Sequence, residues 1–176
     1  MGLNLLAWAA LGYFVGAIPS AALVVRLLGS PGDNARHARR IAVVAFALDV
    51  VKGAALVWLA SQLAWTAYAT SAAGIMAVVG QSWSFWTPKR GGTGMPVAIG
   101  ALAVTVPLAL FVGAAAGALA FALFRRPVIA ALIGAAITPL ASALLHYPSA
   151  AVLLALGAAL VVCLRTASRN RHASDP

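Results

Sequence analysis

Residues 80–100 read G-Q-S-W-S-F-W-T-P-K-R-G-G-T-G-M-P-V-A-I-G. The stretch combines a basic pair, Lys89-Arg90, with three glycines in four positions and with Pro96, placed where a helix can begin. A Gly-rich turn that leads with cations into a helix N-terminus offers backbone N–H groups and positive potential to an anion. We therefore expect a phosphate-binding loop formed by Arg90, Gly91, Gly92, Thr93 and Gly94.

The chain on either side of this loop is almost entirely apolar. Of its 176 residues, 63% are hydrophobic and 9% are charged, whereas soluble domains average about 45–50% apolar and about 25% charged residues. This composition is typical of an integral membrane protein, and we expect a single integral membrane domain over residues 1–176. The net charge of +9 lies in the flanks of apolar segments, so membrane topology explains it better than nucleic-acid binding does.

The apolar segments set the number of membrane helices. Segments that suit one span each lie at 3–25, 41–60, 62–80, 127–145 and 149–164, the last of them slightly short. We keep residues 1–28 as one helix. Residues 95–124 are uncharged over thirty positions, which is too long for one untilted span and short for two, and Pro107 divides them.

The basic residues set the orientation. Eleven of the twelve Lys and Arg residues fall in four clusters, at 26–40, 89–90, 125–126 and 165–171. The positive-inside rule places all four clusters in the cytoplasm. Residues 95–124 must then turn back on themselves. We predict an all-α polytopic membrane protein with seven membrane helices, one of them short and re-entrant, with the N-terminus outside and the C-terminus inside.

Two charges lie inside the second apolar segment. Asp49 and Lys52 are three residues apart and share one helix face. Each costs at least about 2.5–3.5 kcal/mol in lipid, so we expect them to face the bundle and to be paired. They suit either a structural lock between helices or a proton-coupling pair of a transporter, and the lock is favoured because one pair makes a poor relay.

The remaining polar residues leave alternatives open. Ser30 and Asn34 in the first loop suit either a substrate contact or a turn that caps the next helix. We expect Arg125, Arg126 and Arg165 to be ordinary topology-setting residues. The three histidines are scattered without acidic neighbours, which argues against a metal site. Any catalysis has to rely on positioning and charge stabilisation.

Four segments resemble the PlsY family, the bacterial membrane glycerol-3-phosphate acyltransferases that use acyl phosphate as donor. They are G-Y-F-V-G-A-I-P-S at 12–20, L-D-V-V-K-G at 48–53, the stretch at 80–100, and F-R-R-P at 124–127. The resemblance implies a seven-helix enzyme of the bacterial inner membrane, without a cofactor, whose cytoplasmic loops form the site. It implies transfer of a fatty acyl group from acyl phosphate to glycerol 3-phosphate, giving lysophosphatidate and phosphate.

The resemblance also assigns roles to residues. Carried over by position, Arg90 with glycines 91, 92 and 94 matches the phosphate-binding loop. With a deletion between them, Ser30 and Asn34 match catalytic positions, and the family arginine corresponds to Arg36, Arg39 or Arg40, of which we assign Arg39. The chain departs from the family pattern at Gln81, where the family usually has His, and at Thr93, where it usually has Lys. Its first loop, G-S-P-G-D-N, is also shorter. These departures keep two alternatives open: a catalytically inactive PlsY-like membrane protein, and a small transporter.

Overall fold

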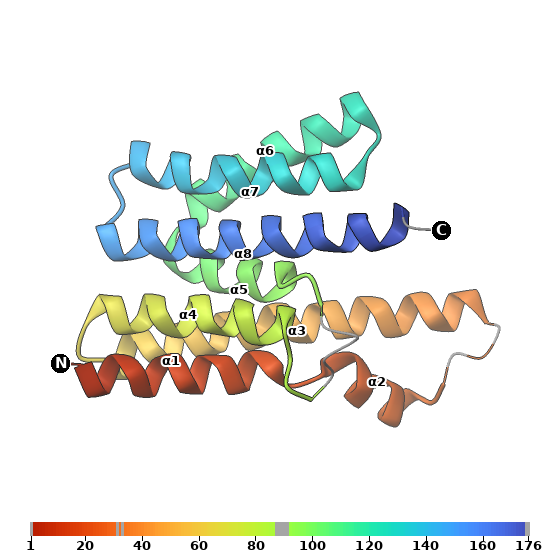
Figure 1. Cartoon of the computed structure of the whole chain (residues 1–176), viewed down its shortest axis with the longest axis horizontal. Helices are drawn as coiled ribbons and strands as arrows, with labels where there is room; N and C mark the ends of the chain where they lie inside the picture. The colour runs from red at the N-terminus through yellow and green to blue at the C-terminus, as the bar shows by residue number, and fades with distance from the viewer. Residues whose placement is uncertain (1, 31, 33, 87–91, 175–176) are drawn as a thin grey trace.

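The chain folds into a bundle of helices that run along one common direction (Figure 1). The computed structural model describes residues 2–30, 32, 34–86 and 92–174, with side chains up to residue 168. Within these residues it contains eight helices and no strand. The helices are α1 (Gly2–Ala17), α2 (Ser20–Leu28), α3 (Ala35–Leu63), α4 (Ala67–Ser82), α5 (Met95–Thr105), α6 (Pro107–Phe124), α7 (Pro127–Leu144) and α8 (Ser149–Ser174).

The bundle is a multi-pass membrane fold. Five stretches are long and apolar enough to cross a membrane by length and composition. They are Gly2–Leu28, Ala35–Leu63, Pro107–Phe124, Pro127–Leu144 and Ser149–Ser168, and α5 is a shorter apolar helix. Many large apolar side chains lie on the outside of the bundle, as expected where lipid surrounds the helices. The predicted all-α polytopic fold is confirmed.

The short helix α5 turns back inside the bundle. It ends at Thr105, and the next residue, Val106, is fully buried before Pro107 begins α6. Figure 1 shows α5 entering from the same end to which α6 returns. Pro107 has no N–H to continue the hydrogen-bond ladder, so the helix restarts there in a new direction. Residues 95–124 therefore make the re-entrant turn that charge parity predicts.

Three predicted helix boundaries are wrong. The first helix is not continuous over 1–28, because it ends at Ala17 and α2 begins after Pro19. The second begins at Ala35 rather than at 41, so the residues just before the predicted apolar segment are also helical. The last runs to Ser174 rather than to 164. Basic residues extend both helices beyond their apolar parts because Arg has a high helix propensity.

Glycines bring two helix pairs into backbone contact. A Cβ on Gly16 of α1 would overlap the carbonyl group of Ala77 in α4. A Cβ on Gly100 of α5 would overlap the carbonyl of Val50 in α3. Small residues allow this close approach, and close approach supplies the van der Waals contact that holds membrane helices together. The contacts fix α4 and α5, and hence the loop between them, against α1 and α3.

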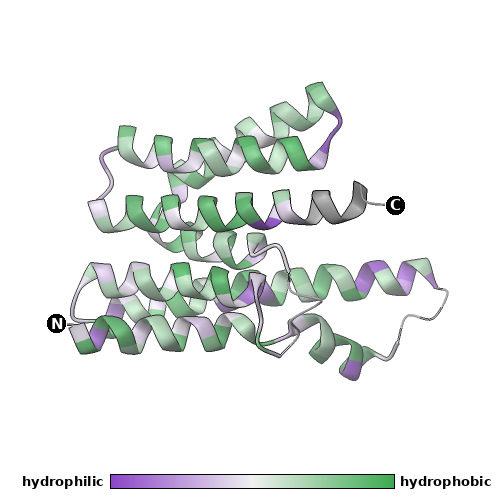
Figure 2. Ribbon diagram, in the orientation of Figure 1, coloured by the Kyte–Doolittle hydropathy of each residue, from purple (hydrophilic) through white to green (hydrophobic). Residues whose placement is uncertain are grey.

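The polar residues gather at one end of the bundle, which we call the basic end. It comprises the α2–α3, α4–α5 and α6–α7 connections and the C-terminal part of α8 (Figure 1). Figure 2 shows the strongly hydrophilic residues of α3, α8 and the α6–α7 turn at this end. The other end holds the N-terminus and the α3–α4 and α7–α8 turns. This arrangement places the α4–α5 loop at the basic end.

Candidate functional site

The α4–α5 loop begins at a fixed point on α1. The Ser84 hydroxyl donates to the carbonyl oxygen of Ala17 at 2.7 Å, and the Tyr13 hydroxyl donates to the carbonyl oxygen of Trp83 at 3.1 Å. The Trp86 N–H donates to Ser84 Oγ at 3.2 Å. These bonds hold the start of the loop where α1 ends. The loop is therefore positioned from its first residues.

The far side of the loop is fastened to α4 and α8. The Gly92 N–H donates to the carbonyl oxygen of Gln81 at 2.9 Å, so the chain closes back on the end of α4. Arg165 of α8 donates from Nε to the carbonyl oxygen of Gly92 at 3.3 Å. Its guanidinium also lies 5.7 Å from the centre of the Trp83 ring, a distance at which a cation is attracted to an aromatic face. Helices α4 and α8 thus hold the Gly92 turn, while α1 holds the start of the loop.

Gly94 gives the turn its shape. Its φ of 75° lies in the left-handed region that favours glycine. An added Cβ would lie 2.5 Å from Ser82 Oγ and 2.8 Å from Val78 Cγ1. The position therefore excludes a side chain both by conformation and by space. Of the three glycines on which the sequence prediction rests, Gly94 shows this backbone requirement, Gly92 does not have a positive φ, and Gly91 lies outside the described residues.

The first turn of α5 is capped by the two residues that depart from the family pattern. The Met95 N–H donates to Thr93 Oγ1, and the Val97 N–H donates to Gln81 Oε1, both at 3.4 Å. The free N–H groups of a helix N-terminus are the groups that bind anions. Gln81 and Thr93 take two of them here. These two amide groups are therefore not free to bind an anion.

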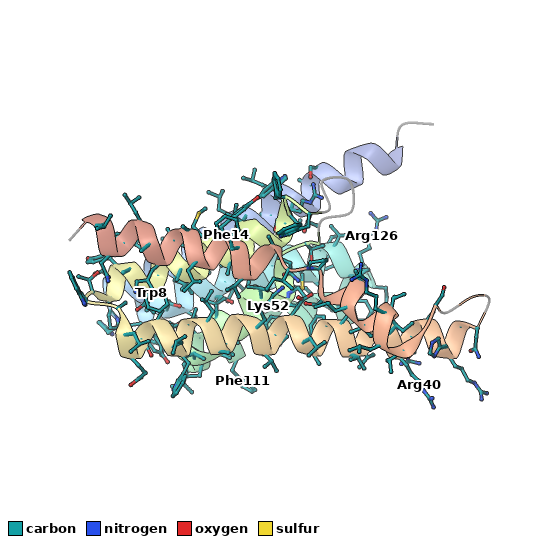
Figure 3. The ribbon with its side chains drawn as sticks, turned by 90° about the horizontal axis from the view of Figure 1, so that it is seen from below. Trp8, Phe14, Arg40, Lys52, Phe111 and Arg126 are labelled. Atoms are coloured by element: carbon teal, nitrogen blue, oxygen red, sulfur yellow. The ribbon has the colours of Figure 1, made fainter. Side chains whose placement is uncertain are left out.

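The predicted site residues fall into two places. Gly92, Thr93 and Gly94 form the turn just described, while Arg90 and Gly91 lie outside the described residues. Ser30, Asn34 and Arg39 are exposed at the outer end of α3. Figures 1 and 3, seen from perpendicular directions, both place that end of α3 apart from the α4–α5 loop.

Helix geometry gives the scale of this separation. Gly53 of α3 packs on Val97, in the first turns of α5. Asn34 precedes Gly53 by nineteen residues, which at about 1.5 Å per residue is about 28 Å along the helix axis. Asn34 Oδ1 also accepts the N–H groups of Arg36 and His37, each at 3.1 Å. Of the two alternatives for Asn34, the structure displays the helix cap.

The intramembrane pair closes the break between α1 and α2 (Figure 3 labels Lys52). Lys52 Nζ lies 2.8 Å from Asp49 Oδ1 and donates to the carbonyl oxygens of Gly16 and Ile18, each at 3.1 Å. The Ser20 hydroxyl donates to Asp49 Oδ1 at 2.5 Å. Carbonyl groups left without helical partners at a break need such donors, most of all in a membrane. The pair therefore joins α3 to the first membrane segment.

Sequence reasoning missed Arg165. It was expected to set topology only, yet the structure brings it to the Gly92 turn. The signal in the sequence was its position just after the last apolar segment, on the same predicted membrane side as the loop. Position along the chain did not distinguish it from Arg125 or Arg126, which are exposed at the α6–α7 turn.

An apolar groove of about 230 Å³ begins beside the turn. It lies between α5, α6, α7 and α8, and its lining runs from Met95, at the start of α5, to Leu102. Small residues of the other three helices, such as Gly117, Ala131 and Ala158, line the rest of the groove. Chemically, the groove accepts a hydrocarbon chain, and its Met95 end adjoins the polar turn.

The sequence is similar to that of known glycerol-3-phosphate acyltransferases. A family model described as glycerol-3-phosphate acyltransferase matches residues 6–173. The glycerol-3-phosphate acyltransferase of Myxococcus xanthus is 35% identical over 129 residues, which cover 65% of this chain and 67% of that protein. Glycerol-3-phosphate acyltransferase 5 of Dehalococcoides mccartyi is 29% identical over 139 residues, covering 72% and 59%. The chain thus spans about three fifths to two thirds of the length of these relatives.

A solved structure shares the fold. The crystal structure of PlsY (YgiH), an integral membrane glycerol 3-phosphate acyltransferase in its lysophosphatidic acid form, superposes with a TM-score of 0.81. The match covers 96% of this chain and 91% of that chain at 18% sequence identity. At this identity the likeness establishes the arrangement of the helices.

Proposed function

The chain belongs to the glycerol-3-phosphate acyltransferase family, and on this premise we propose that it transfers a fatty acyl group from an acyl phosphate to glycerol 3-phosphate. The 1-hydroxyl oxygen of glycerol 3-phosphate bonds to the acyl carbon, and the bond from that carbon to the phosphate oxygen breaks. The products are lysophosphatidate and inorganic phosphate, and the hydroxyl proton leaves on a phosphate. The reaction needs no cofactor.

The observation that carries this proposal is the fastening of the Gly92–Gly94 turn. Gly92 is bonded to Gln81 on one side and to Arg165 on the other, and Gly94 has a conformation that favours glycine. A turn fixed in this way presents backbone groups and a cation without reorganisation when charge develops, which is how enzymes stabilise oxyanions. In the proposal Arg90, Gly91 and Thr93 complete the phosphate-binding loop.

The apolar groove supports an acyl substrate. Its Met95 end adjoins the turn, so a phosphate held by the loop leaves the attached acyl chain beside an apolar surface. Burial of a hydrocarbon chain contributes about 0.8 kcal/mol per CH₂ group. Binding energy from the chain then helps to position the reacting carbonyl.

The proposal includes a location and an orientation. The protein resides in the bacterial inner membrane with its N-terminus outside and the basic end in the cytoplasm. The exposed arginines 26, 36, 39, 40, 125 and 126 all lie on segments of the basic end, which supports this orientation because basic residues are retained on the cytoplasmic side. Figure 2 shows strongly hydrophilic residues at this end. Both substrates then reach the loop from the cytoplasm or from the inner leaflet.

The direct test is acyl transfer by the purified protein in detergent, with palmitoyl phosphate and radiolabelled glycerol 3-phosphate. We expect lysophosphatidate and inorganic phosphate in equal amounts, and no product when palmitoyl coenzyme A replaces palmitoyl phosphate. Arg90→Ala should lower turnover at least tenfold, whereas the matched control Arg126→Ala should retain it. Absence of product with both substrates present would refute the proposal.

A second candidate is a non-catalytic family member that keeps the fold. The specific observation in its favour is the separation of Ser30, Asn34 and Arg39 from the Gly92–Gly94 turn. We propose that these three residues align the acceptor, glycerol 3-phosphate. If the wild type is active, Ser30→Ala or Arg39→Gln should lower kcat at least a hundredfold. Full activity of both variants would show that the residues do not align the acceptor.

The Asp49–Lys52 pair favours a structural role over transport. Both charged groups are committed to each other and to neighbouring helices, as Lys52 donates to two carbonyl oxygens and Asp49 accepts from Ser20. A relay group exchanges its proton with a neighbour during turnover. A group that closes a helix break cannot do so without opening the break.

A further inference from the structure

A pair of helices projects from the basic end, away from the Gly92–Gly94 turn. α2 and the first turns of α3 pack through Val24, Ile41 and Ala45, which form a small buried cluster of their own. Figure 1 shows the pair reaching beyond the ends of the neighbouring helices. We call this pair the arginine lobe. It carries the exposed residues Arg26, Arg36, Arg39 and Arg40.

Three of these arginines share one face of α3. Arg36, Arg39 and Arg40 follow the i, i+3, i+4 spacing that places side chains on the same side of a helix. This face lies opposite to Ile41 and Ala45, which pack on α2. Figure 3 shows the Arg40 side chain pointing away from the bundle. The charges therefore face the surroundings rather than the protein.

The same face continues as an apolar stripe. Val43 and Val51 follow the arginines along it, and their side chains are 60% and 62% exposed. In a membrane-spanning helix such side chains contact the hydrocarbon of the lipids. The arginines come directly before this stripe, and Arg39 and Arg40 lie about one turn from its first residue, Val43. They therefore lie at the level of the lipid headgroups.

The other helix of the lobe, α2, has the pattern of an interfacial helix. α2 exposes Leu23, Leu27 and Leu28, and Arg26 is exposed in its last turn. A short helix with exposed apolar side chains and a basic residue suits the boundary between headgroups and acyl chains. Both helices of the lobe thus indicate the same depth in the bilayer.

The lobe carries an excess of positive charge. Residues 26–40 contain four arginines and one acidic residue, Asp33, which gives a net charge of +3. Asp49, farther along α3, is paired with Lys52. A charge excess at headgroup level attracts anionic lipids, and each guanidinium fits two oxygens of a phosphate group.

From this placement we infer that the arginine lobe binds the anionic headgroups of glycerophospholipids in the adjacent leaflet. This binding uses a surface apart from the Gly92–Gly94 turn, and it is assigned to Arg26, Arg36 and Arg40 rather than to Arg39, which the proposed function keeps for the acceptor. It fixes the depth and tilt of the first two membrane segments against the bilayer. It also concentrates anionic lipid beside the protein.

The test is native mass spectrometry of the full-length protein in a neutral detergent. Phosphatidylglycerol and phosphatidylcholine with identical acyl chains are added in equal amounts, and the two lipid-bound forms are compared. We expect the wild type to retain phosphatidylglycerol about tenfold more than phosphatidylcholine. Arg36→Gln/Arg40→Gln should lower this ratio about tenfold, since each basic residue near an anionic surface contributes a several-fold preference.

A matched control removes the same charge elsewhere at the basic end. Arg125→Gln/Arg126→Gln, in the α6–α7 turn, should keep the ratio within about twofold of the wild type. Equal losses in both variants would mean a general attraction and would overturn the inference, as would equal binding of the two lipids by the wild type. Release of phosphatidylglycerol by excess inorganic phosphate would identify a free-phosphate site instead, which also overturns it.

A third variant guards against misfolding. Arg26→Gln changes the other helix of the lobe and should lower the lipid ratio about threefold to fivefold. Helical content by circular dichroism and the thermal midpoint are measured for every variant. If the α3 double variant is unfolded, an unchanged ratio in Arg26→Gln refutes the inference by itself.

Discussion

Lys52 Nζ lies 3.1 Å from the carbonyl oxygen of Gly16, across the boundary between α3 and the first membrane segment. The same ammonium group is 2.8 Å from Asp49 Oδ1 and also reaches the carbonyl oxygen of Ile18. One cation therefore satisfies a carboxylate and two backbone groups that the break at Pro19 leaves without helical partners. The break and the pair depend on each other.

Removal of Lys52 should destabilise the protein strongly. Lys52→Met leaves Asp49 without a counter-charge and removes the ammonium donor from the carbonyl oxygens of Gly16 and Ile18, of which Ile18 keeps the Ser20 N–H. We expect a loss of about 3 kcal/mol. The double variant Asp49→Asn/Lys52→Met should recover part of this loss because no unpaired charge remains. Chemical unfolding in detergent micelles, followed by circular dichroism, measures both. A Lys52→Met protein as stable as the wild type would contradict the lock.

Gly94 offers a test of the turn that uses another glycine as its control. Gly94→Ala forces a side chain into a left-handed φ of 75° and against Ser82 and Val78, so it should shift the start of α5 and lower stability by about 2–4 kcal/mol. Gly29→Ala also has a positive φ, of 85°, but its Cβ would meet nothing within 4 Å. We expect Gly29→Ala to cost about 1–3 kcal/mol from backbone strain alone, because its ψ of 166° places it in a region that is essentially restricted to glycine. Equal thermal shifts in the two variants would show that packing at Gly94 is unimportant.

Contact between α3 and α5 should depend on Gly100. Gly100→Ala places a methyl group against the backbone of Val50, and separation of the two helices should cost about 1–3 kcal/mol or more. Gly2→Ala, where a Cβ meets nothing within 4 Å, serves as the control and should be neutral. Thermal unfolding in detergent distinguishes them. A neutral Gly100→Ala would mean that α5 is not held at this contact.

Gln81 should contribute to stability as an acceptor for α5. Gln81→Met removes the oxygen that accepts the Val97 N–H, and a buried donor without a partner costs about 1–3 kcal/mol. The control Gln62→Met changes an exposed glutamine in the last turn of α3. It should change stability by less than about 0.5 kcal/mol. Unfolding curves of the two variants provide the comparison. Indistinguishable curves would remove the capping role of Gln81.

Arg165 should matter for turnover if the proposed function holds. Arg165→Gln loses a charge-assisted hydrogen bond to Gly92, worth about 1.5–3 kcal/mol, so kcat/KM for palmitoyl phosphate should fall at least tenfold. Arg126→Gln removes an exposed arginine from the same end of the bundle and should leave kcat/KM within twofold. Steady-state assays on folded protein measure the difference. Equal values for the two variants would mean that Arg165 only sets topology.

Hydropathy and charge predicted most of the fold because both are read locally along the chain. They indicated the membrane class, the approximate segments and, through the alternation of basic clusters, the return of residues 95–124 at Pro107. The break at Pro19 was missed because the apolar pattern continues through it. The starts of α3 and α8 were misplaced because arginines end a hydrophobic pattern without ending a helix.

The candidate site was predictable only in part. The glycines of the 91–94 turn were visible, since Gly94 needs a conformation that other residues rarely adopt. The contact of Arg165 with Gly92 was not visible, because seventy-three positions separate the two residues in sequence. The distance from Asn34 to the turn also depends on where α3 begins, which apolar periodicity did not reveal.

Hydropathy and charge along the chain are enough to predict a multi-pass membrane bundle with a Gly-rich turn at its basic end and a charged pair inside an apolar segment. Which helices hold that turn, what the pair closes, and which arginines face lipid became clear from the folded arrangement. The physical reason is that apolar helices have no sequence pattern that names their neighbours. Their partners follow from where glycines permit backbone contact, and that fit exists only between folded surfaces.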